Sequence, residues 1–356
     1  MRGGRSNVCQ LRTHGRFPSS RNRYRTRCIG LFRGDTAGYL IIAGGCNFPE
    51  VPIAEGGTKR YYKGIYATPL DKGIRLTWRQ IGALPDAAAY GVSIITGDGL
   101  IFIGGNNQRN TFSSVIRIRW ESHSRERIQI DSLPGLPFPS DNMTGCRAGD
   151  YLYVAGGNKA GIPCHQFIRL DLRHEELRWE TLPPFPGQAR IQLVCGAIGT
   201  NFFLFGGFDL TARSIALNDY LYRAEAKAWE EITGPVDEYS SPLALGGGAS
   251  VSMNDRMFFV GGIYRNLFRI GMTDPPADYM KHPAAWYRFN PYLLQYDVNG
   301  WSILEKSPAK RTGAGELPVT ARTGASFVND GKNLYLIGGE LKPGIRTNEI
   351  YRITVK

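Results

Sequence analysis

The chain has 356 residues, of which 42% are hydrophobic, 12% aromatic and 21% charged, and its formal net charge is +12. This composition, with 44 glycines, is typical of a globular protein built from short strands and tight turns, and excludes a disordered or fibrous chain. Apolar runs of fewer than ten residues also exclude a membrane-spanning helix.

The positive charge is concentrated at the N-terminus. Residues 1–33 contain nine arginines and no acidic residue, so the rest of the chain is close to neutral. One interpretation is an arm that binds nucleic acid or an anionic surface; the other is a leader without regular structure, or a start placed too early. Only Phe17, Tyr24 and Phe32 are available to stack on bases. The second interpretation is therefore favoured, with no nucleic-acid partner.

The sequence leaves the compartment open. A secretory signal needs an apolar stretch of about 7–15 residues, and residues 1–28 contain none. The six cysteines form no CxxC pair and no His-linked zinc spacing. We expect scattered thiols, no metal and no cofactor.

Six apolar, β-prone runs end in a pair of glycines. The pairs are Gly44-Gly45, Gly104-Gly105, Gly156-Gly157, Gly206-Gly207, Gly261-Gly262 and Gly338-Gly339. Their first members are separated by 60, 52, 50, 55 and 77 residues, a period that suits a four-stranded propeller blade of the kelch type with insertions. One blade cannot bury both of its faces, so the blades must close into a ring. The sequence therefore predicts an all-β fold, a six-bladed kelch-type β-propeller over residues 28–356, preceded by a basic segment over residues 1–27.

Each repeat has the same order of strands. A glycine-rich strand such as residues 90–95 is followed by the apolar strand, by a third strand with an aromatic residue, and by a fourth strand that begins near a tryptophan and ends at a proline. These tryptophans are Trp78, Trp179, Trp229 and Trp301. We expect the glycines to allow sharp turns, the tryptophans to form apolar plates between blades and the prolines to stop the outer strands.

Two features interrupt the regular pattern. The last unit ends in a third strand over residues 348–355, so we expect an N-terminal strand near Val8 to Leu11 to complete the ring. Insertions occupy residues 263–292, rich in aromatic and basic groups, and residues 305–321. Long loops on a rigid scaffold often carry function or an interface, and a homodimer face is one candidate. A surface elaboration that packs on itself is the alternative, and the sequence leaves both open.

Residues 338–347, Gly-Gly-Glu-Leu-Lys-Pro-Gly-Ile-Arg-Thr, resemble a run in the bacterial N-acetylneuraminate epimerases, which are sialic acid mutarotases with six-bladed kelch propellers. Residues 43–59 and 89–93 are also similar to that family, and the similarity covers the chain from about residue 28. In exported members the Glu-x-Lys-Pro-Gly-x-Arg run lies mid-chain and the other segments lie near the C-terminus. The order in this chain is rotated, so it resembles a cyclically permuted branch, which a closed ring tolerates. The resemblance implies a periplasmic location, although no signal peptide is visible.

The resemblance implies that Glu340 and Arg346 are the catalytic pair of an isomerase that interconverts the α and β anomers of N-acetylneuraminate. The substrate is a cyclic hemiketal whose anomeric carbon bears a carboxylate. Ring opening removes the anomeric hydroxyl proton and protonates the ring oxygen, which is general acid–base chemistry. A guanidinium can hold the carboxylate in a bidentate manner. The alternative from residue types alone is a loop salt bridge between Glu340 and Arg346.

Five other residues are candidate contacts to an anionic sugar. Arg190 and Arg322 each precede the first strand of a repeat and would add positive charge, unless they serve packing. Asn47 and Tyr90 would donate hydrogen bonds to hydroxyl or N-acetyl groups, although Tyr90 also suits inter-blade packing. Lys342 would attract an anion, or is simply solvated.

Other classes of protein fit less well. The main alternative is a kelch propeller that binds proteins or carbohydrates without catalysis, and such a protein needs no acid–base pair at the mouth of the ring. A copper radical oxidase needs Tyr, His and Cys ligands on the axis, whereas the five histidines follow no repeat position. A sialidase would show repeated Ser-x-Asp-x-Gly-x-x-Trp boxes, which are absent from the sequence.

Overall fold

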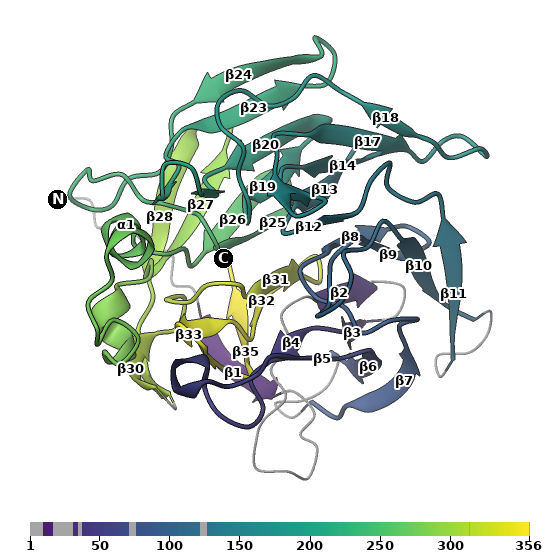
Figure 1. Cartoon of the computed structure of the whole chain (residues 1–356). Helices are drawn as coiled ribbons and strands as arrows, with labels where there is room; N and C mark the ends of the chain where they lie inside the picture. Colours follow the sequence, from purple (N-terminus) through teal and green to yellow (C-terminus); the bar gives the residue numbers. More distant parts are fainter. Residues whose placement is uncertain are drawn as a thin grey trace, which may run out of the picture.

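The computed structural model describes residues 10–16, 31–34, 38–70, 76–121, 127–312 and 314–355, with only the backbone of residues 10–16 and 31–34. These residues are nearly all β, as predicted: six four-stranded antiparallel sheets surround a central axis (Figure 1). The helices among them are α1 (Arg265–Thr273) and the 3-10 helices η1 (Ile53–Glu55) and η2 (Ala284–Tyr287). No helix in this part of the chain is long and apolar enough to cross a membrane.

The sheets follow one another along the chain, and each extends from an inner strand at the axis to an outer strand at the rim. Sheet 1 is β2 (Leu31–Gly34), β3 (Tyr39–Ala43), β6 (Gly64–Pro69) and β7 (Arg79–Ala83); sheet 2 is β8 (Val92–Thr96), β9 (Gly99–Ile103), β10 (Val115–Trp120) and β11 (Ile128–Leu133). Sheet 3 is β13 (Thr144–Ala148), β14 (Tyr151–Ala155), β17 (Phe167–Asp171) and β18 (Trp179–Thr181); sheet 4 is β19 (Val194–Ile198), β20 (Asn201–Phe205), β23 (Asp219–Arg223) and β24 (Ala228–Ile232). Sheet 5 is β25 (Ala249–Met253), β26 (Arg256–Val260), β27 (Tyr292–Asp297) and β28 (Gly300–Lys306); sheet 6 is β31 (Ser326–Asn329), β32 (Asn333–Ile337), β35 (Glu349–Thr354) and β1 (Gln10–Arg16).

Sheet 6 combines strands from both ends of the chain. β1 pairs antiparallel with β35, from Gln10 opposite Thr354 to Arg16 opposite Glu349, with a register shift near Thr13. β1 overlaps the closing strand expected near Val8 to Leu11, whose first two residues lie outside the described part. What the sequence predicts for the rest of residues 1–27 also lies outside it.

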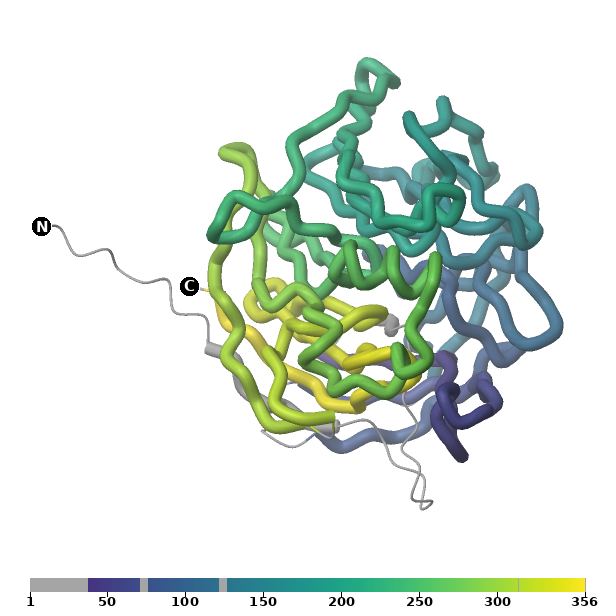
Figure 2. The backbone as a smooth tube through the Cα atoms, turned by 60° about the vertical axis from the view of Figure 1, so that its left-hand side comes forward, coloured from purple at the N-terminus to yellow at the C-terminus, as the bar shows by residue number. Residues whose placement is uncertain are grey.

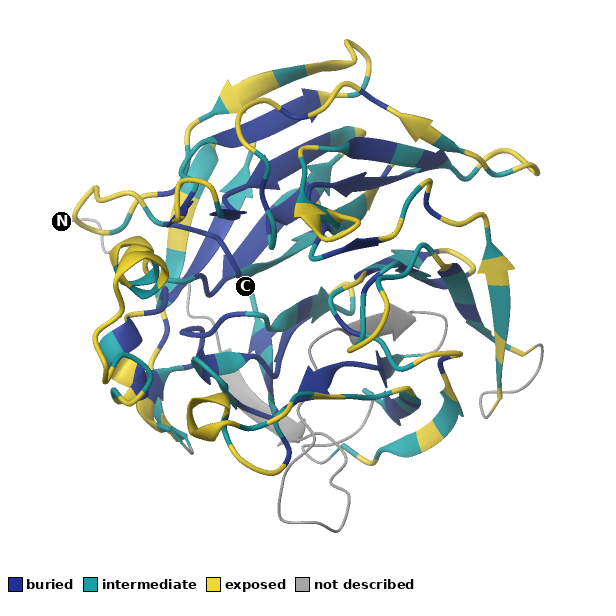
Figure 3. Ribbon diagram, in the orientation of Figure 1, coloured by how far each residue is buried: buried dark blue, intermediate teal, exposed yellow. Residues whose placement is uncertain are grey.

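Apolar side chains fill the space between neighbouring sheets. Five clusters join sheets 1 and 2, 2 and 3, 3 and 4, 4 and 5, and 5 and 6. A sixth joins sheet 6 to sheet 1, where Leu40 and Ile42 contact Tyr335, Ile337 and Ile350. Figure 3 shows these buried strands inside an exposed outer rim. Each fully buried side chain of this kind contributes about 1.5–3 kcal/mol, so the layers between sheets hold the assembly together.

The glycine pairs link each sheet to the next. Gly104 and Gly105 have φ of +58° and +97°, a region that side chains with a Cβ rarely adopt. The Gly105 N–H donates to the Ser140 carbonyl, at 2.8 Å, in the segment that leads into sheet 3. A Cβ on Gly104 would lie 2.6 Å from that same oxygen. The repeated pair is therefore required for both the turn and the close approach of two sheets.

The tryptophans of the outer strands bridge neighbouring sheets, in line with the sequence prediction. The indole N–H groups of Trp179, Trp229 and Trp301 donate to the carbonyls of Pro134, Pro183 and Thr233, at 2.8–3.0 Å, at the end of the preceding sheet. Each indole ring thus packs between two sheets and also donates a hydrogen bond, as expected of an amphipathic side chain.

The two insertions pack against each other and against the segment after β32. Residues 263–292 contain α1 and η2, and residues 305–321 form a hairpin of β29 (Ala309–Thr312) and β30 (Gly315–Pro318). Ala284 of η2, Leu317 of β30 and Leu341 form one buried cluster. Figure 2 shows the green first insertion beside the yellow C-terminal segment. The insertions therefore brace the loop that contains Glu340 and Arg346.

Candidate functional site

A collar of backbone hydrogen bonds surrounds the axis where the chain enters the inner strands. The residues at this position in sheets 2 to 6 all have left-handed backbone conformations: Tyr90, Asn142, Gln192, Gly247 and Gly324, with φ of 51–72°. Each N–H, from Asn142 onward, donates to the carbonyl of the preceding member at 2.8–3.1 Å. These residues precede the inner strands and do not continue their extended backbone. The side chains of Tyr90, Asn142 and Gln192 therefore lie together at one end of the axis.

A short hairpin at the edge of this collar carries the predicted pair. β33 (Glu340–Lys342) and β34 (Ile345–Arg346) follow the last glycine pair, and Glu340 lies directly opposite Arg346. The Glu340 backbone exchanges hydrogen bonds of 2.7 and 3.0 Å with Thr323, which enters β31. Gly344 makes the turn at φ +74°. The hairpin thus fixes both side chains relative to the axis.

Glu340 and Arg346 form an ion pair. Arg346 Nε donates to Glu340 Oε2 at 3.2 Å, and the Arg346 side chain is 6% exposed and that of Glu340 20%. Arg346 Nη1 donates to the Cys46 carbonyl and lies 3.4 Å from Cys46 Sγ. Among the described residues, no donor binds Glu340 Oε1. The pair is therefore held in place while one carboxylate oxygen keeps its hydrogen-bonding capacity.

The electrostatic setting keeps Arg346 charged. Burial lowers the pKa of Arg346, but the acidic groups around it, first Cys46 and then Glu340, outweigh burial and raise its pKa above the usual value. A permanently charged guanidinium beside a carboxylate is a suitable anchor for an anionic ligand.

Tyr90 completes the charged side of the site. Its hydroxyl accepts a hydrogen bond from Lys59 Nζ at 3.0 Å and lies 3.4 Å from Cys46 Sγ. Burial, followed by the electrostatic effect of the nearby Cys46, raises the pKa of Tyr90, and these effects outweigh the opposing charge of Arg346. The tyrosine is therefore a neutral hydrogen-bonding group at neutral pH.

These residues line a cavity of about 340 Å³ at the mouth of the axis. Its side-chain lining is Tyr90, Asn142, Met143, Gln192, Leu193, Phe208, Ile263, Thr323, Glu340 and Arg346. Small-molecule sites typically have about 300–1,000 Å³. A mixture of apolar walls with a few convergent polar groups is what such sites need to orient a ligand.

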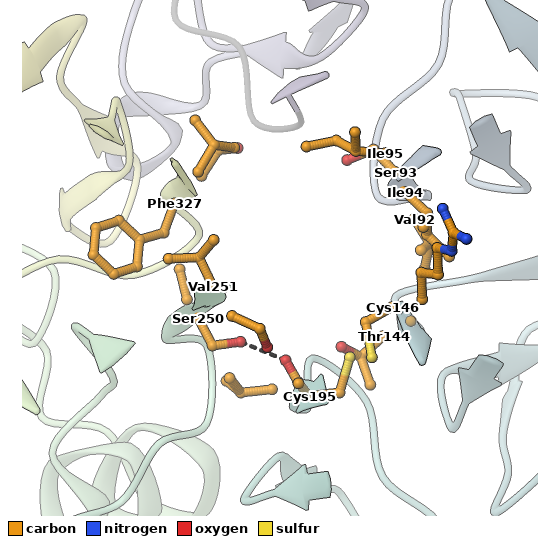
Figure 4. Close-up of a pocket in the computed structure, with 18 of the residues that line it drawn as sticks. Val92, Ser93, Ile94, Ile95, Thr144, Cys146, Cys195, Ser250, Val251 and Phe327 are labelled. Carbon is orange, nitrogen blue, oxygen red and sulfur yellow. Dashed lines mark hydrogen bonds between the residues drawn. The ribbon is translucent and has the colours of Figure 1, made fainter. Parts of the chain in front are cut away.

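A second cavity, of about 360 Å³, continues along the axis between the inner strands. Figure 4 shows its wall, where Ser93, Thr144, Cys146, Cys195 and Ser250 face the open centre. The pKa of Cys146 is raised well above its usual value, first by its hydrogen bond with Cys195 and then by burial. No carboxylate lines this channel among the described residues, whereas Glu340 lines the cavity at the mouth.

The structure does not bring all of the predicted contact residues to the cavity. Arg190 is 2% exposed and donates to the Gly206 and Asn218 carbonyls at 3.1 and 2.9 Å. Arg322 is 1% exposed and donates to the Val319 and Gly338 carbonyls at 2.8 and 2.6 Å. Their guanidinium groups satisfy backbone oxygens near glycine pairs. This matches the packing alternative, and neither arginine is among the residues that line the cavity.

The remaining two candidates also lie behind the cavity wall. Lys342 Nζ donates to the His282 carbonyl at 2.8 Å and thereby ties the first insertion to β33. The lysine is half-buried and does not line the cavity. Asn47 is buried, with its Oδ1 accepting a 2.7 Å hydrogen bond from the Tyr62 hydroxyl. It follows Cys46, whose carbonyl accepts a hydrogen bond from Arg346 Nη1.

Sequence reasoning missed Asn142, Gln192 and Phe208. The first two occupy the repeat position of Tyr90, immediately before the inner-strand residues of sheets 3 and 4. Aligning the repeats on their inner strands would have found them. Nothing in the local sequence distinguishes Phe208 from the other aromatic residues.

Comparisons with known proteins identify relatives of this chain. The family model of N-acetylneuraminate epimerase matches residues 133–356. The N-acetylneuraminate epimerase of Salmonella enteritidis PT4 (strain P125109) is 30% identical over 239 residues, covering 62% of this chain and 58% of that protein. That of Escherichia coli O9:H4 (strain HS) is 28% identical over 239 residues, covering 62% and 60%.

A solved structure is also similar. The protein titled "Structure of YjhT" aligns with a TM-score of 0.52 and 26% identity, over 63% of this chain and 65% of that one. The matched region spans about 60% of the length of the curated relatives. Because the family model covers more than half of the chain, including the β33–β34 hairpin, the chain belongs to the N-acetylneuraminate epimerase family.

Proposed function

We propose that this protein is a sialic acid mutarotase that interconverts the α and β anomers of N-acetylneuraminate by opening and reclosing the sugar ring. The observation that carries the proposal is the Glu340–Arg346 pair, 3.2 Å apart, on the wall of the mouth cavity. The names of the relatives supply the substrate, and the absence of a protein donor to Glu340 Oε1 among the described residues supports a proton-transfer role.

In this proposal the six sheets are the blades of a kelch-type β-propeller over residues 28–356. The apolar layer between sheets 6 and 1 supports a closed ring, and β1 supports closure by a strand from residues 1–27. The match to the family model begins only at residue 133. A cyclic permutation would explain this late start. A family model aligns residues in chain order, so it cannot match sheets that lie at the opposite end of the chain in the relatives.

The chemistry follows from the positions of the two groups. The Arg346 guanidinium binds the substrate carboxylate and orients the anomeric carbon towards Glu340. Glu340 takes the proton of the anomeric hydroxyl as the bond from the anomeric carbon to the ring oxygen breaks, and then gives this proton to the ring oxygen, which regenerates the carboxylate and leaves the open-chain keto acid. Rotation about the bond from the new keto carbon to the sugar chain presents its other face, and the reverse steps close the ring as the other anomer. Positioned proton transfer of this kind contributes about 10²–10⁴-fold in rate.

The test is the anomer exchange itself. Proton NMR of freshly dissolved α-anomer, with and without protein, should show faster appearance of the β-anomer, and Glu340→Gln should lose about 10²-fold or more of that acceleration. Arg346→Lys keeps the charge but not the planar fork, so it should raise KM more than it lowers kcat.

The control is Glu316→Gln, the same change on the exposed face of the β29–β30 hairpin, which should retain full activity. Equal rates for the unmodified protein and Glu340→Gln would refute the assignment. A ligand-binding propeller without catalysis is then the remaining function, because it would bind the sugar without changing the exchange rate.

A further inference from the structure

Two carboxamide side chains lie across the mouth cavity from the charged pair. Asn142 and Gln192 enter sheets 3 and 4, whereas Glu340 and Arg346 lie in the β33–β34 hairpin, between β32 and β35 of sheet 6. Sheets 3 and 6 are opposite one another in the sequence of six, as the positions of β13 and β33 in Figure 1 show. All four side chains line the same cavity. The cavity therefore has a charged end and a neutral, amide end.

The left-handed backbone conformation of these two residues indicates that their side chains have a function. Asn142 and Gln192 have φ of +53° and +51°, while the same collar position is glycine at residues 247 and 324. Glycine adopts this conformation without steric cost, and glutamine does not. Because strain of this kind gathers at binding sites, the glutamine at position 192 points to a ligand contact, whereas asparagine tolerates this conformation.

A hydrogen-bond chain orients both amides. Gln192 Nε2 donates to Asn142 Oδ1 at 3.2 Å, and Asn142 Nδ2 donates to Asp141 Oδ1 at 2.7 Å. Asp141 is further fixed by the amides of Asn106 and Asn158, at 2.8 and 2.7 Å. The chain ends at Gln192 Oε1, which has no donor among the described residues. One acceptor, together with the second N–H of each amide, thus remains available to the cavity.

An apolar wall lies beside the amides. Phe208 pairs through its backbone with Ile191, the residue before Gln192. Its ring stacks on Phe268 of α1 at 4.6 Å. Ile263, at the start of the first insertion, lines the same cavity. The amide end therefore combines hydrogen-bonding groups with a rigid apolar surface.

We propose that Asn142, Gln192 and Phe208 form the subsite for the acetamido substituent of the sugar acid, an inference that rests on the proposed function. A trans amide has its N–H and C=O on opposite edges, so it needs an acceptor on one side and a donor on the other. Gln192 Oε1 supplies the acceptor and Asn142 Nδ2 the donor. Phe208 covers the methyl group. The subsite thereby determines which sugar acids are held with their anomeric carbon at Glu340.

The experiment compares two substrates in Gln192→Met, which keeps side-chain length and removes the amide. The substrates are N-acetylneuraminate and its analogue with a hydroxyl in place of the acetamido group. For N-acetylneuraminate we expect KM to rise about ten-fold, the loss that one or two hydrogen bonds produce, with kcat unchanged. For the analogue we expect both constants to be unchanged, so the preference of the unmodified protein disappears. Gln192→Asn, which restores a carboxamide, should recover part of the preference.

Gln129→Met, the same change on outer strand β11, is the control and should behave as the unmodified protein. An equal loss for both substrates, or no change for either, would overturn the subsite. Isothermal titration calorimetry of the two sugars makes the same comparison without catalysis. A protein that binds with this preference but exchanges no anomers would refute the proposed function and retain the subsite.

Discussion

At the scale of single residues, some buried polar groups of this protein bind the backbone and others line the mouth cavity. Arg190 and Arg322 donate hydrogen bonds to backbone carbonyls, whereas Glu340 and Arg346 line the cavity. Asp219 belongs to the first kind. It is 2% exposed, and its Oδ1 accepts the Gly206 N–H at 2.8 Å, which ties the start of β23 to a glycine pair.

Asp219 makes the stability of the fold depend on pH. Burial raises the pKa of Asp219 to about 7, above the ordinary 3.8 of an aspartate. The folded state therefore holds this proton more tightly than the unfolded state. The stabilisation is complete below about pH 4 and is lost as pH rises through 7, at up to about 1.4 kcal/mol per pH unit.

Asp219→Asn should flatten that decline in the free energy of unfolding, because the amide keeps an acceptor for Gly206 and does not ionise. Urea unfolding at pH 5, 6, 7 and 8 measures it, with the exposed Asp255→Asn as the control. A variant whose stability still falls between pH 5 and 7 as in the unmodified protein would contradict the assignment.

At the scale of elements, the outer strands are held to the preceding sheet by their tryptophans. The Trp229 ring lies 4.7 Å from that of Phe167 and 6.3 Å from that of Phe185, both of sheet 3 or the segment after it. The indole N–H donates to the Pro183 carbonyl. The contact is thus part apolar and part polar, and the two parts can be separated by mutation.

Trp229→Phe should cost about 1 kcal/mol of unfolding free energy, the loss of one hydrogen bond. Trp229→Ala should cost about 3 kcal/mol, because a cavity opens between sheets 3 and 4. Chemical denaturation measures both values. Trp301→Phe, at the junction of sheets 4 and 5, is the matched variant, and the two Phe substitutions should be additive since they share no partner. Equal effects of Phe and Ala at position 229 would show that ring packing contributes nothing.

At the scale of the whole molecule, the ring depends on a strand from the N-terminal end. β1 supplies the fourth strand of sheet 6. Sheet 6 shares an apolar layer with sheet 1, and the β33–β34 hairpin with Glu340 connects two of its strands, β32 and β35. Without β1, β35 would become an unprotected edge whose free N–H and C=O groups can pair with another chain.

Deletion of residues 1–16 should therefore lower the melting temperature by more than about 5 °C and promote association. Differential scanning calorimetry and size-exclusion chromatography measure the two effects. An unchanged melting temperature with a monomeric elution profile would show that sheet 6 is stable with three strands.

The sequence by itself determined the nearly all-β class, the six repeats and the order of strands within each repeat, because these follow from local signals. Glycine pairs, tryptophans and a Pro-Gly turn act within or next to their own repeat. Tertiary structure alone decided which side chains reach the cavity. Asn142 and Gln192 are 50 residues apart and meet only because adjacent sheets bring equivalent repeat positions together at 3.2 Å. Arg190 and Arg322 do not line the cavity, because nearby backbone carbonyls bind their guanidinium groups. Which acceptors lie within reach depends on distances that the linear sequence does not contain.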